Sequence, residues 1–99
     1  LVPVFAGRME EANLFYQASS WGSIIQSVWS FMLALRARGL GSAWTTGHLW
    51  REKALAELLE IPDYYTKVGL FPIAYTLGTD FKPAYRKDPS EVIGWNGFA

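Results

Sequence analysis

The sequence predicts a fold that combines helices with short strands, and three observations lead to this prediction. A mostly apolar segment, residues 23–38, ends in signals that close a helix. Residues 50–60 have the apolar spacing of an amphipathic helix. Residues 1–6 and 65–75 are short runs rich in apolar side chains, which is typical of strands.

Length and composition limit the size of the core. The chain has 99 residues, 51% of them hydrophobic, with five Trp, five Tyr and six Phe. Such a chain forms one domain at most and buries roughly two-thirds of the surface that its unfolded form exposes. We therefore expect exposed apolar surface, to be covered by a partner subunit, a further segment of chain or a large planar ligand.

Charge and residue types argue against several classes of function. Nine basic and nine acidic residues cancel, so no net field attracts nucleic acid or an anionic membrane. The absence of cysteine and the single histidine argue against disulfides and the usual metal sites. The most apolar stretch, residues 21–35, contains polar residues and is shorter than the roughly 20 residues that a bilayer requires. We expect a cytoplasmic protein without bound metal, nucleic acid or membrane span.

The N-terminal part is expected to begin with a strand at residues 1–6. Pro3 suits the start or the edge of a strand, and Gly7 ends it. Residues 8–20 mix charged and apolar side chains with weak helical spacing, so we interpret them as a loop with one or two helical turns. Because the chain opens on a strand-like run rather than on Met and a leader, we expect it to be a portion of a longer protein.

The most apolar segment is expected to form a core helix. The pattern from Ser23 to Gln26 fits a capping box, which predicts that the helix starts at Ser23. The apolar side chains that follow go round most of the helix, so we expect it to be enclosed on nearly all sides. Arg36 and Arg38 suit the negative end of the helix dipole, and Gly39 supplies the left-handed residue that ends the helix.

A turn and a second helix follow. Residues 40–44 form a brief extended piece that leads to the turn of residues 45–48. The helix of residues 50–60 is expected to lie on the surface, with Pro62 beyond its end. One face carries leucines and the opposite face carries charge: Leu55, Leu58 and Leu59 against Glu52, Lys53, Glu57 and Glu60.

The last part of the chain should contain one strand and one short helical turn. Residues 65–75 are predicted to form a strand, in which Pro72 favours a sheet edge or a bulge. Residues 88–91 fit a single capped turn with proline at its first position. A final apolar segment then needs a surface to lie against: Val92, Ile93, Trp95 and Phe98.

The common enzyme signatures are weak or absent in this sequence. A Ser-His-Asp triad would have to use His48, and no nucleophile-elbow pattern frames any serine. The adjacent carboxylates of Glu10 and Glu11 are explained by surface charge. The glycines Gly39 and Gly41 follow a helix and are closer together than a nucleotide fingerprint requires. The residues alone therefore name no catalytic group.

The turn after the core helix allows two interpretations. Gly41, Ser42 and Gly47 let the backbone approach a flat ligand, whose carbonyl and ring nitrogens exposed N–H groups would suit. Alternatively, the segment is only a helix end and a tight turn in which Thr45 and Thr46 cap locally. Composition and spacing leave both interpretations open.

Two further groups are equally ambiguous. His48 is either a packed loop residue or a proton donor. Arg86 and Lys87, with Lys82 nearby, either hold a phosphate or are simply solvated. The sequence contains no other basic cluster outside Arg36 and Arg38.

A series of segments resembles the second half of flavin-dependent nitroreductases, especially the actinobacterial type. The first is the run from Ala34 to Leu49, ALRARGLGSAWTTGHL. Further segments agree in order and spacing: 58–62 (LLEIP), 70–75 (LFPIAY), and Arg86 leading into 89–96 (PSEVIGWN). The resemblance covers nearly the whole chain from about Ser20 onward.

The resemblance implies an α+β fold, with a mixed sheet and helices packed around a buried central helix. It implies that residues 1–99 are the C-terminal part of a single nitroreductase-like domain, without the N-terminal segment. It also implies an intertwined homodimer that binds FMN at the subunit interface. The apolar tail would then wrap the partner subunit.

The same resemblance implies the site and the reaction. Thr45, Thr46, Gly47 and His48 would lie against the isoalloxazine ring, and Arg86 would contact the phosphate. NAD(P)H is the implied co-substrate, and a small nitroaromatic or quinone accepts the electrons in a ping-pong reaction. No catalytic side chain is implied, because the cofactor carries out the difficult step.

Two departures from the family pattern are visible. The family's Arg- and Ser-rich start, which forms half of the FMN site, has no counterpart in these residues, and Ala74 stands where many members have glycine. Two alternatives therefore stay open beside the enzyme. The chain is a flavin-sequestering or structural member without turnover, or it is an inert piece whose motifs only pack.

Overall fold

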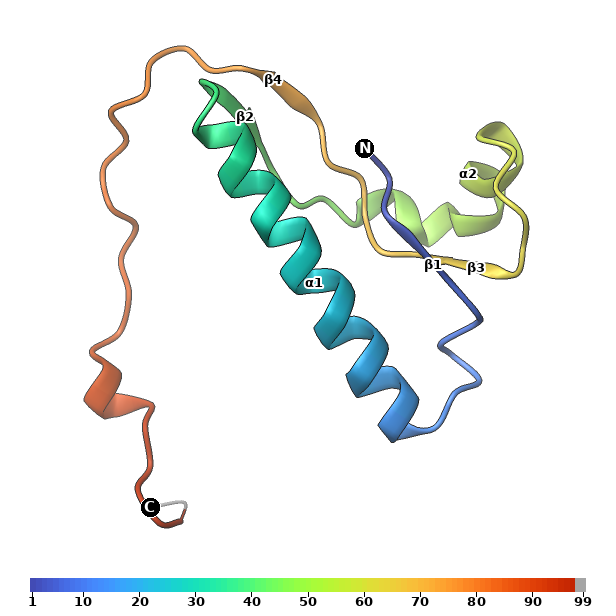
Figure 1. The fold of residues 1–99 in the computed structure, drawn as a ribbon, viewed down its shortest axis with the longest axis horizontal. Coiled ribbons are helices and arrows are strands. Elements are labelled where there is room, and N and C mark those ends of the chain that lie inside the picture. The colour runs from blue at the N-terminus through green and yellow to red at the C-terminus, as the bar shows by residue number, and fades with distance from the viewer. Residues whose placement is uncertain (98–99) are drawn as a thin grey trace.

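The computed structural model describes residues 1–97 of the chain, and Phe98 of the predicted apolar tail lies outside this range. The helices and strands follow one another in this order: β1 (Val4–Ala6), α1 (Leu14–Arg36), β2 (Leu40–Ser42), the 3₁₀ helix η1 (Gly47–Arg51), α2 (Glu52–Leu58), β3 (Tyr65–Lys67), β4 (Ile73–Tyr75) and the 3₁₀ helix η2 (Pro89–Glu91). Helices and short sheets are combined in one chain, as an α+β fold requires (Figure 1).

The strands form two separate antiparallel pairs. β1 pairs with β3, and β2 pairs with β4 (Figure 1). Beyond β1, Leu1 and Phe71 exchange two main-chain hydrogen bonds of 3.0 and 2.8 Å, which extend the first pairing toward the N-terminus. The expected mixed sheet is therefore not formed within residues 1–97, where two antiparallel pairs replace it.

The strand predicted at residues 65–75 is divided into β3 and β4. Pro72 lies just before β4 and has no N–H to donate, so it cannot take part fully in a ladder. The chain between the two strands pairs with other segments, because Val68 donates to Pro3 and Leu70 donates to Thr45. The prediction of one continuous strand was wrong, although Pro72 marked the interruption.

Helix α1 begins at Leu14, which corrects the predicted start at Ser23. The side chain of Asn13 accepts the N–H of Tyr16 at 3.1 Å and thus caps the helix. Ser23 and Gln26 lie within the helix, so their pattern acts as no cap. The part of residues 8–20 interpreted as a loop is consequently helical from Leu14 onward.

Gly39 closes this helix as predicted, although the helix ends two residues before the predicted residue 38. The last helical residue is Arg36, and Gly39 adopts φ +76° two residues beyond the cap. The N–H of Gly39 donates to the carbonyl of Arg36 at 3.1 Å, which closes the last turn. Glycine suits this conformation because it has no Cβ to clash with the carbonyl.

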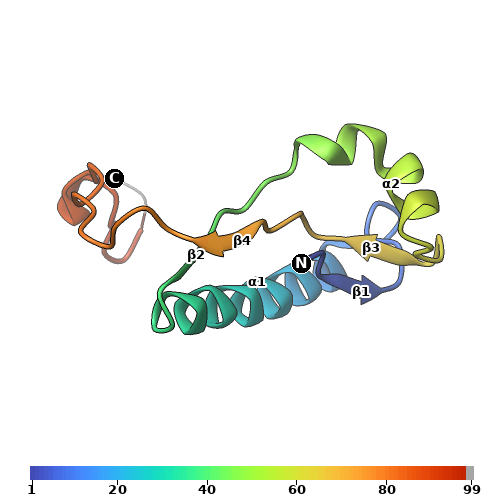
Figure 2. The same cartoon turned by 90° about the horizontal axis from the view of Figure 1, so that it is seen from above.

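The core is small, and its residues come from α1, α2 and the segment between β3 and β4. Figure 2 shows α1 and α2 on opposite sides of the chain that carries β3 and β4. The hydrophobic members of the core are Val28, Leu35, Ala56, Val68 and Phe71. Aromatic pairs extend it on two sides: the rings of Phe5 and Trp21 meet edge to face at 5.1 Å, and those of Trp44 and Phe71 lie 5.3 Å apart.

The expected enclosure of α1 is not found in the single chain. Only Val28 and Leu35 of this helix are buried, whereas Trp29 is 58% exposed on another side. Ile25 and Leu33 share that exposure. Residues spaced by three or four positions lie on one helix face, so these side chains form an apolar stripe. The expectation of exposed apolar surface is confirmed.

Helix α2 is shorter than predicted and continues directly from η1. Its one buried residue is Ala56, while Leu58 and Leu59 are exposed. The predicted leucine face therefore does not lie wholly on the core in this chain. The N–H of Ile61 donates to the carbonyl of Ala56 at 2.8 Å, and Pro62 follows, as predicted, beyond the end of the helix.

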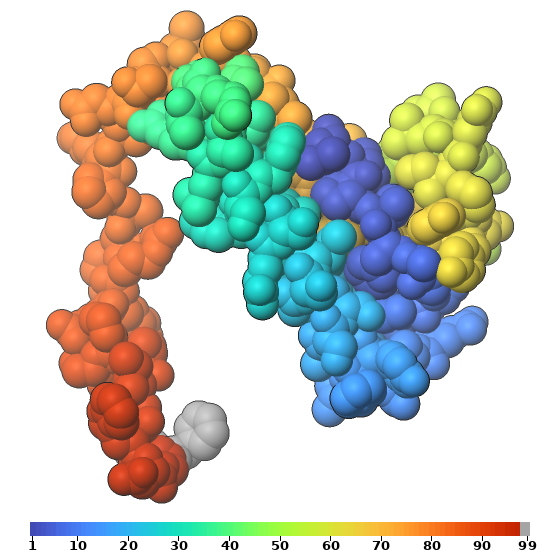
Figure 3. Space-filling view, in the orientation of Figure 1, coloured from blue at the N-terminus to red at the C-terminus, as the bar shows by residue number. Residues whose placement is uncertain are grey.

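The C-terminal residues form an extended arm. Figure 3 shows this arm running beside the body of the molecule, with open space between it and α1. The predicted capped turn is present in the arm, because the carboxylate of Asp88 accepts the N–H of Ser90 at 2.8 Å and Pro89 opens η2. The apolar residues of the arm are exposed: Leu77, Phe81, Tyr85, Val92, Ile93 and Trp95.

Candidate functional site

The turn of residues 45–48 is held at its start by Thr45. The N–H of Thr45 donates to the carbonyl of Leu70 at 3.1 Å, and the N–H of Leu70 donates back at 2.9 Å. The Thr45 hydroxyl also donates to the Leu70 carbonyl at 2.6 Å. These three bonds connect segments far apart in the sequence, so the turn starts from a fixed point.

The turn exposes backbone donors. Thr46 precedes η1, and the N–H of Leu49 donates to its carbonyl at 2.9 Å. Among residues 1–97, the N–H groups of Thr46, Gly47 and His48 have no acceptor. The first N–H groups of a helical turn lack intrahelical partners and are available to a ligand.

Two other features of the turn fit a flat, polar-edged ligand. A Cβ on Gly47 would meet no other atom within 4 Å, so the space above its backbone is open. The Nε2 atom of His48 is buried and has no hydrogen-bond partner within the described residues. A buried polar atom without a partner is unfavourable and suits a site that a ligand completes. The residues of this turn therefore fit the ring of a flavin.

A tight contact beneath the turn sets its position, and the sequence alone gave little sign of it. Gly69 is buried against Trp44, and a Cβ at Gly69 would lie 2.8 Å from Nε1 of that indole. Trp44 packs in turn on the fully buried Phe71. An interior glycine next to a strand often marks such a close approach, which is the signal that could have identified Gly69.

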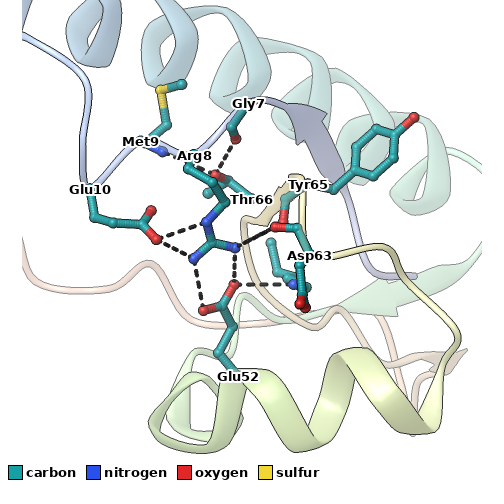
Figure 4. A network of polar contacts seen from close by, with 9 residues as sticks. Gly7, Arg8, Met9, Glu10, Glu52, Asp63, Tyr65 and Thr66 are labelled. Atoms are coloured by element: carbon teal, nitrogen blue, oxygen red, sulfur yellow. Dashed lines mark hydrogen bonds and ion pairs between the residues drawn. The ribbon is translucent and has the colours of Figure 1, made fainter.

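A charged network lies at the other end of η1 (Figure 4). Arg8 donates to both oxygens of Glu52, through Nη1 at 2.8 Å and Nη2 at 3.1 Å. Nζ of Lys67 donates to Oε1 of Glu52 at 3.2 Å, and Arg8 also binds Glu10. The local pattern of residues 50–60 predicted Glu52 on a solvated helix face, because its partners are distant in the sequence.

The network shifts the proton affinities of its members. The hydrogen bonds from Arg8, together with Lys67, lower the pKa of Glu52 to about 2, against the opposing effect of burial. The hydrogen bond from Arg8 also lowers the pKa of Glu10. The same carboxylates raise the pKa of Arg8. All three groups are therefore charged at neutral pH.

A large apolar groove lies elsewhere, between the C-terminal half of α1 and the β2–β4 pair. Its volume is about 520 Å³, and Trp29, Leu33 and Phe81 contribute to its lining. The groove also contains Ser42, whose buried Oγ has no partner within the described residues. None of the five predicted site residues lines this groove.

The structure does not bring Arg86 to the turn. Arg86 is exposed on the extended arm, and its Nη1 donates to the carbonyl of the neighbouring Tyr85 at 2.8 Å. The arm and the turn lie on different sides of α1 in Figure 1. The assignment of Arg86 to a phosphate stays a prediction.

Other kinds of site are not supported by the described residues. Residues 1–97 contain no group of three or more His, Asp or Glu side chains that could hold a metal ion. Within the same residues, no helix is both long and apolar enough to cross a bilayer. His48 makes no hydrogen bond to a serine there, so the described residues form no Ser-His pair.

Comparison with known proteins adds one finding. A family model described as the Nitroreductase family matches residues 10–75. These residues include α1, the turn of residues 45–48 and every strand other than β1. Arg86 lies outside the matched residues. No curated protein and no solved structure matches the chain. Since the family model covers two-thirds of the sequence, the chain belongs to the nitroreductase family, whose members are generally oxidoreductases that bind flavin.

Proposed function

We propose that this chain is the FMN-binding part of an oxidoreductase that passes electrons from NAD(P)H to a nitroaromatic or quinone acceptor, the two substrates binding in turn. One observation carries the proposal. The turn from Thr45 to His48 lies inside the residues matched by the family and offers N–H donors that have no acceptor among residues 1–97.

The turn contributes orientation and electrostatics to this function. When bound, the flavin supplies the redox chemistry. Thr45 anchors the turn to Leu70, and Gly47 leaves room for a flat ring to approach the backbone. Fixed N–H donors favour negative charge on the ring, because they need little reorganisation as that charge develops. No side-chain acid or base is required at this site.

The exposed apolar surface supports a homodimer. The stripe of Ile25, Trp29 and Leu33 on α1 is unusually apolar for a surface exposed to water. The arm carries a matching surplus of exposed aromatic residues, including Tyr85 and Trp95. We propose that a second copy covers the stripe, and that these residues are the C-terminal part of one nitroreductase-like domain. Arg86 would contact the FMN phosphate in that assembly.

The test is flavin uptake followed by anaerobic reduction. Purified protein is titrated with FMN, and binding is followed through flavin fluorescence. The loaded protein is then mixed with NADH or NADPH without oxygen, and the yellow absorbance is followed. Uptake and bleaching support the oxidoreductase, whereas uptake without bleaching supports a sequestering role. Failure to take up FMN rejects both.

A further inference from the structure

The flavin-facing turn belongs to a segment that is fixed at its two ends. At one end, Thr45 is hydrogen bonded to Leu70 in both directions. At the other end, Glu52, the first residue of α2, binds Arg8 and Lys67. None of residues 46–51 between these points is buried as a whole, although the Nε2 atom of His48 is. The position of the segment therefore depends on its ends.

Glu52 connects the second end to both strands of the β1–β3 pair. Arg8 lies two residues beyond β1, and its guanidinium binds the two carboxylate oxygens of Glu52 at 2.8 and 3.1 Å. Lys67 ends β3 and donates to Glu52 at 3.2 Å. A two-point Arg–carboxylate pair fixes direction as well as distance. Figure 4 shows Glu52 rising from α2 to meet Arg8.

Burial makes this connection hard to break. Only 1% of the Lys67 side chain is exposed, and Glu52 is its one ion-pair partner among residues 1–97. Without the carboxylate, a buried ammonium would be left uncompensated, which is strongly unfavourable. The start of α2 is thus held to the strands by an ion pair whose loss would cost much free energy.

We propose that Glu52, held by Arg8 and Lys67, is a positioning residue that sets the orientation of the Thr45–His48 turn toward the flavin. This inference rests on the proposed function and deepens it. A small displacement of a preorganised donor reduces its effect on developing charge, so a support outside the turn can change the chemistry at the ring. Glu52 would thereby tune how strongly the turn stabilises the reduced flavin.

Three variants and one matched control test the proposal. Glu52→Gln removes the charge, and Glu52→Asp retains it on a shorter side chain. The double variant E52Q/K67M removes the ion pair without leaving a lone buried ammonium, so we expect it to retain the fold. Glu57→Gln is the control, because Glu57 is exposed on the same helix.

The first measurement needs no flavin. The amide of Leu49 donates to the Thr46 carbonyl at 2.9 Å, so its hydrogen exchange reports on the turn. We expect about tenfold faster exchange in Glu52→Gln and in the double variant, because local opening becomes easier. Glu52→Asp should lie between these variants and the wild type, and Glu57→Gln should exchange at the wild-type rate.

The second measurement is the two-electron potential of bound FMN. We expect the preference for reduced over oxidised flavin to fall about tenfold in the double variant, which lowers the potential by about 30 mV. Glu52→Asp should restore part of this difference, which a purely structural role would not do. If the wild type holds FMN and the double variant changes neither exchange nor potential, the inference is wrong and the proposed function stands. A wild type that takes up no FMN removes both.

Discussion

A Cβ atom on Gly69 would lie 2.8 Å from Nε1 of Trp44 and 3.1 Å from the carbonyl oxygen of Thr45. Atoms that are not bonded do not approach one another so closely, so the chain beneath the Thr45–His48 turn accepts glycine alone without rearrangement. The indole packs on the fully buried Phe71 on one side and is itself 40% exposed. Gly69 thus connects the packing of Trp44 to the position of the turn that starts at Thr45.

Gly69→Ala should therefore lower the free energy of unfolding by about 1–3 kcal/mol, as overpacking does. Urea unfolding followed by tryptophan fluorescence measures this change. The control is Gly22→Ala on α1, where an added Cβ meets no atom within 4 Å. That variant should be neutral or up to about 1 kcal/mol more stable, since alanine favours helix. Equal effects in the two variants would show that Trp44 moves aside.

Asn13→Ala should destabilise the start of α1 by about 1 kcal/mol, because the bond from the side chain to the Tyr16 N–H is lost. Ser23→Ala should have almost no effect, because Ser23 lies inside the helix. Circular dichroism during urea unfolding compares the two variants. If Ser23→Ala lowered the free energy of unfolding more than Asn13→Ala does, the helix would start at Ser23 as the capping-box pattern predicted.

The stability of the protein should depend on acid through Glu52. The pKa of this group is about 2 in the folded chain, against an ordinary value of 4.5. Between these pH values Glu52 binds more protons in the unfolded chain than in the folded chain. Its contribution to the free energy of unfolding is therefore fully present above pH 4.5 and is lost as the pH falls toward 2. Glu52→Gln should flatten this part of the curve of unfolding free energy against pH. The same slope in Glu52→Gln as in Glu57→Gln would contradict the assignment.

Gly47→Ala should weaken FMN binding about tenfold, or about 1.4 kcal/mol, because the methyl group would occupy the space above the turn. The free energy of unfolding should stay within about 0.5 kcal/mol of the wild type, since no other atom lies within 4 Å of the new Cβ. Fluorescence titration with FMN and urea unfolding separate the two effects. Unchanged affinity would place the ring elsewhere.

Arg86→Ala should weaken FMN binding by about 1.5–3 kcal/mol, the loss of one charge-assisted contact to the phosphate. Lys87→Ala is the neighbouring control and should bind FMN as the wild type does. Comparison with riboflavin, which has no phosphate, isolates the contribution of Arg86. If Arg86→Ala weakens the binding of riboflavin as much as the binding of FMN, Arg86 acts on the ring or on the fold and not on the phosphate.

The sequence by itself determined the features that depend on neighbouring residues. The left-handed Gly39 ends α1, and Asp88 with Pro89 forms the single capped turn. The extended piece after Gly39 also appears, as β2. Each of these follows from interactions within a few residues, so the local pattern is enough to predict them. The match over residues 10–75 likewise confirms the nitroreductase family, which the run of residues 34–49 resembles.

Only the tertiary structure decided the rest. The Ser23 pattern fitted a capping box, yet Asn13 caps the helix, and the predicted strand 65–75 divides because its two halves find different partners. Glu52 looked like surface charge until the fold brought Arg8 and Lys67 to it from 44 and 15 positions away. Contacts between distant residues depend on how the whole chain folds. A pattern of neighbouring residues does not determine which distant segments come together.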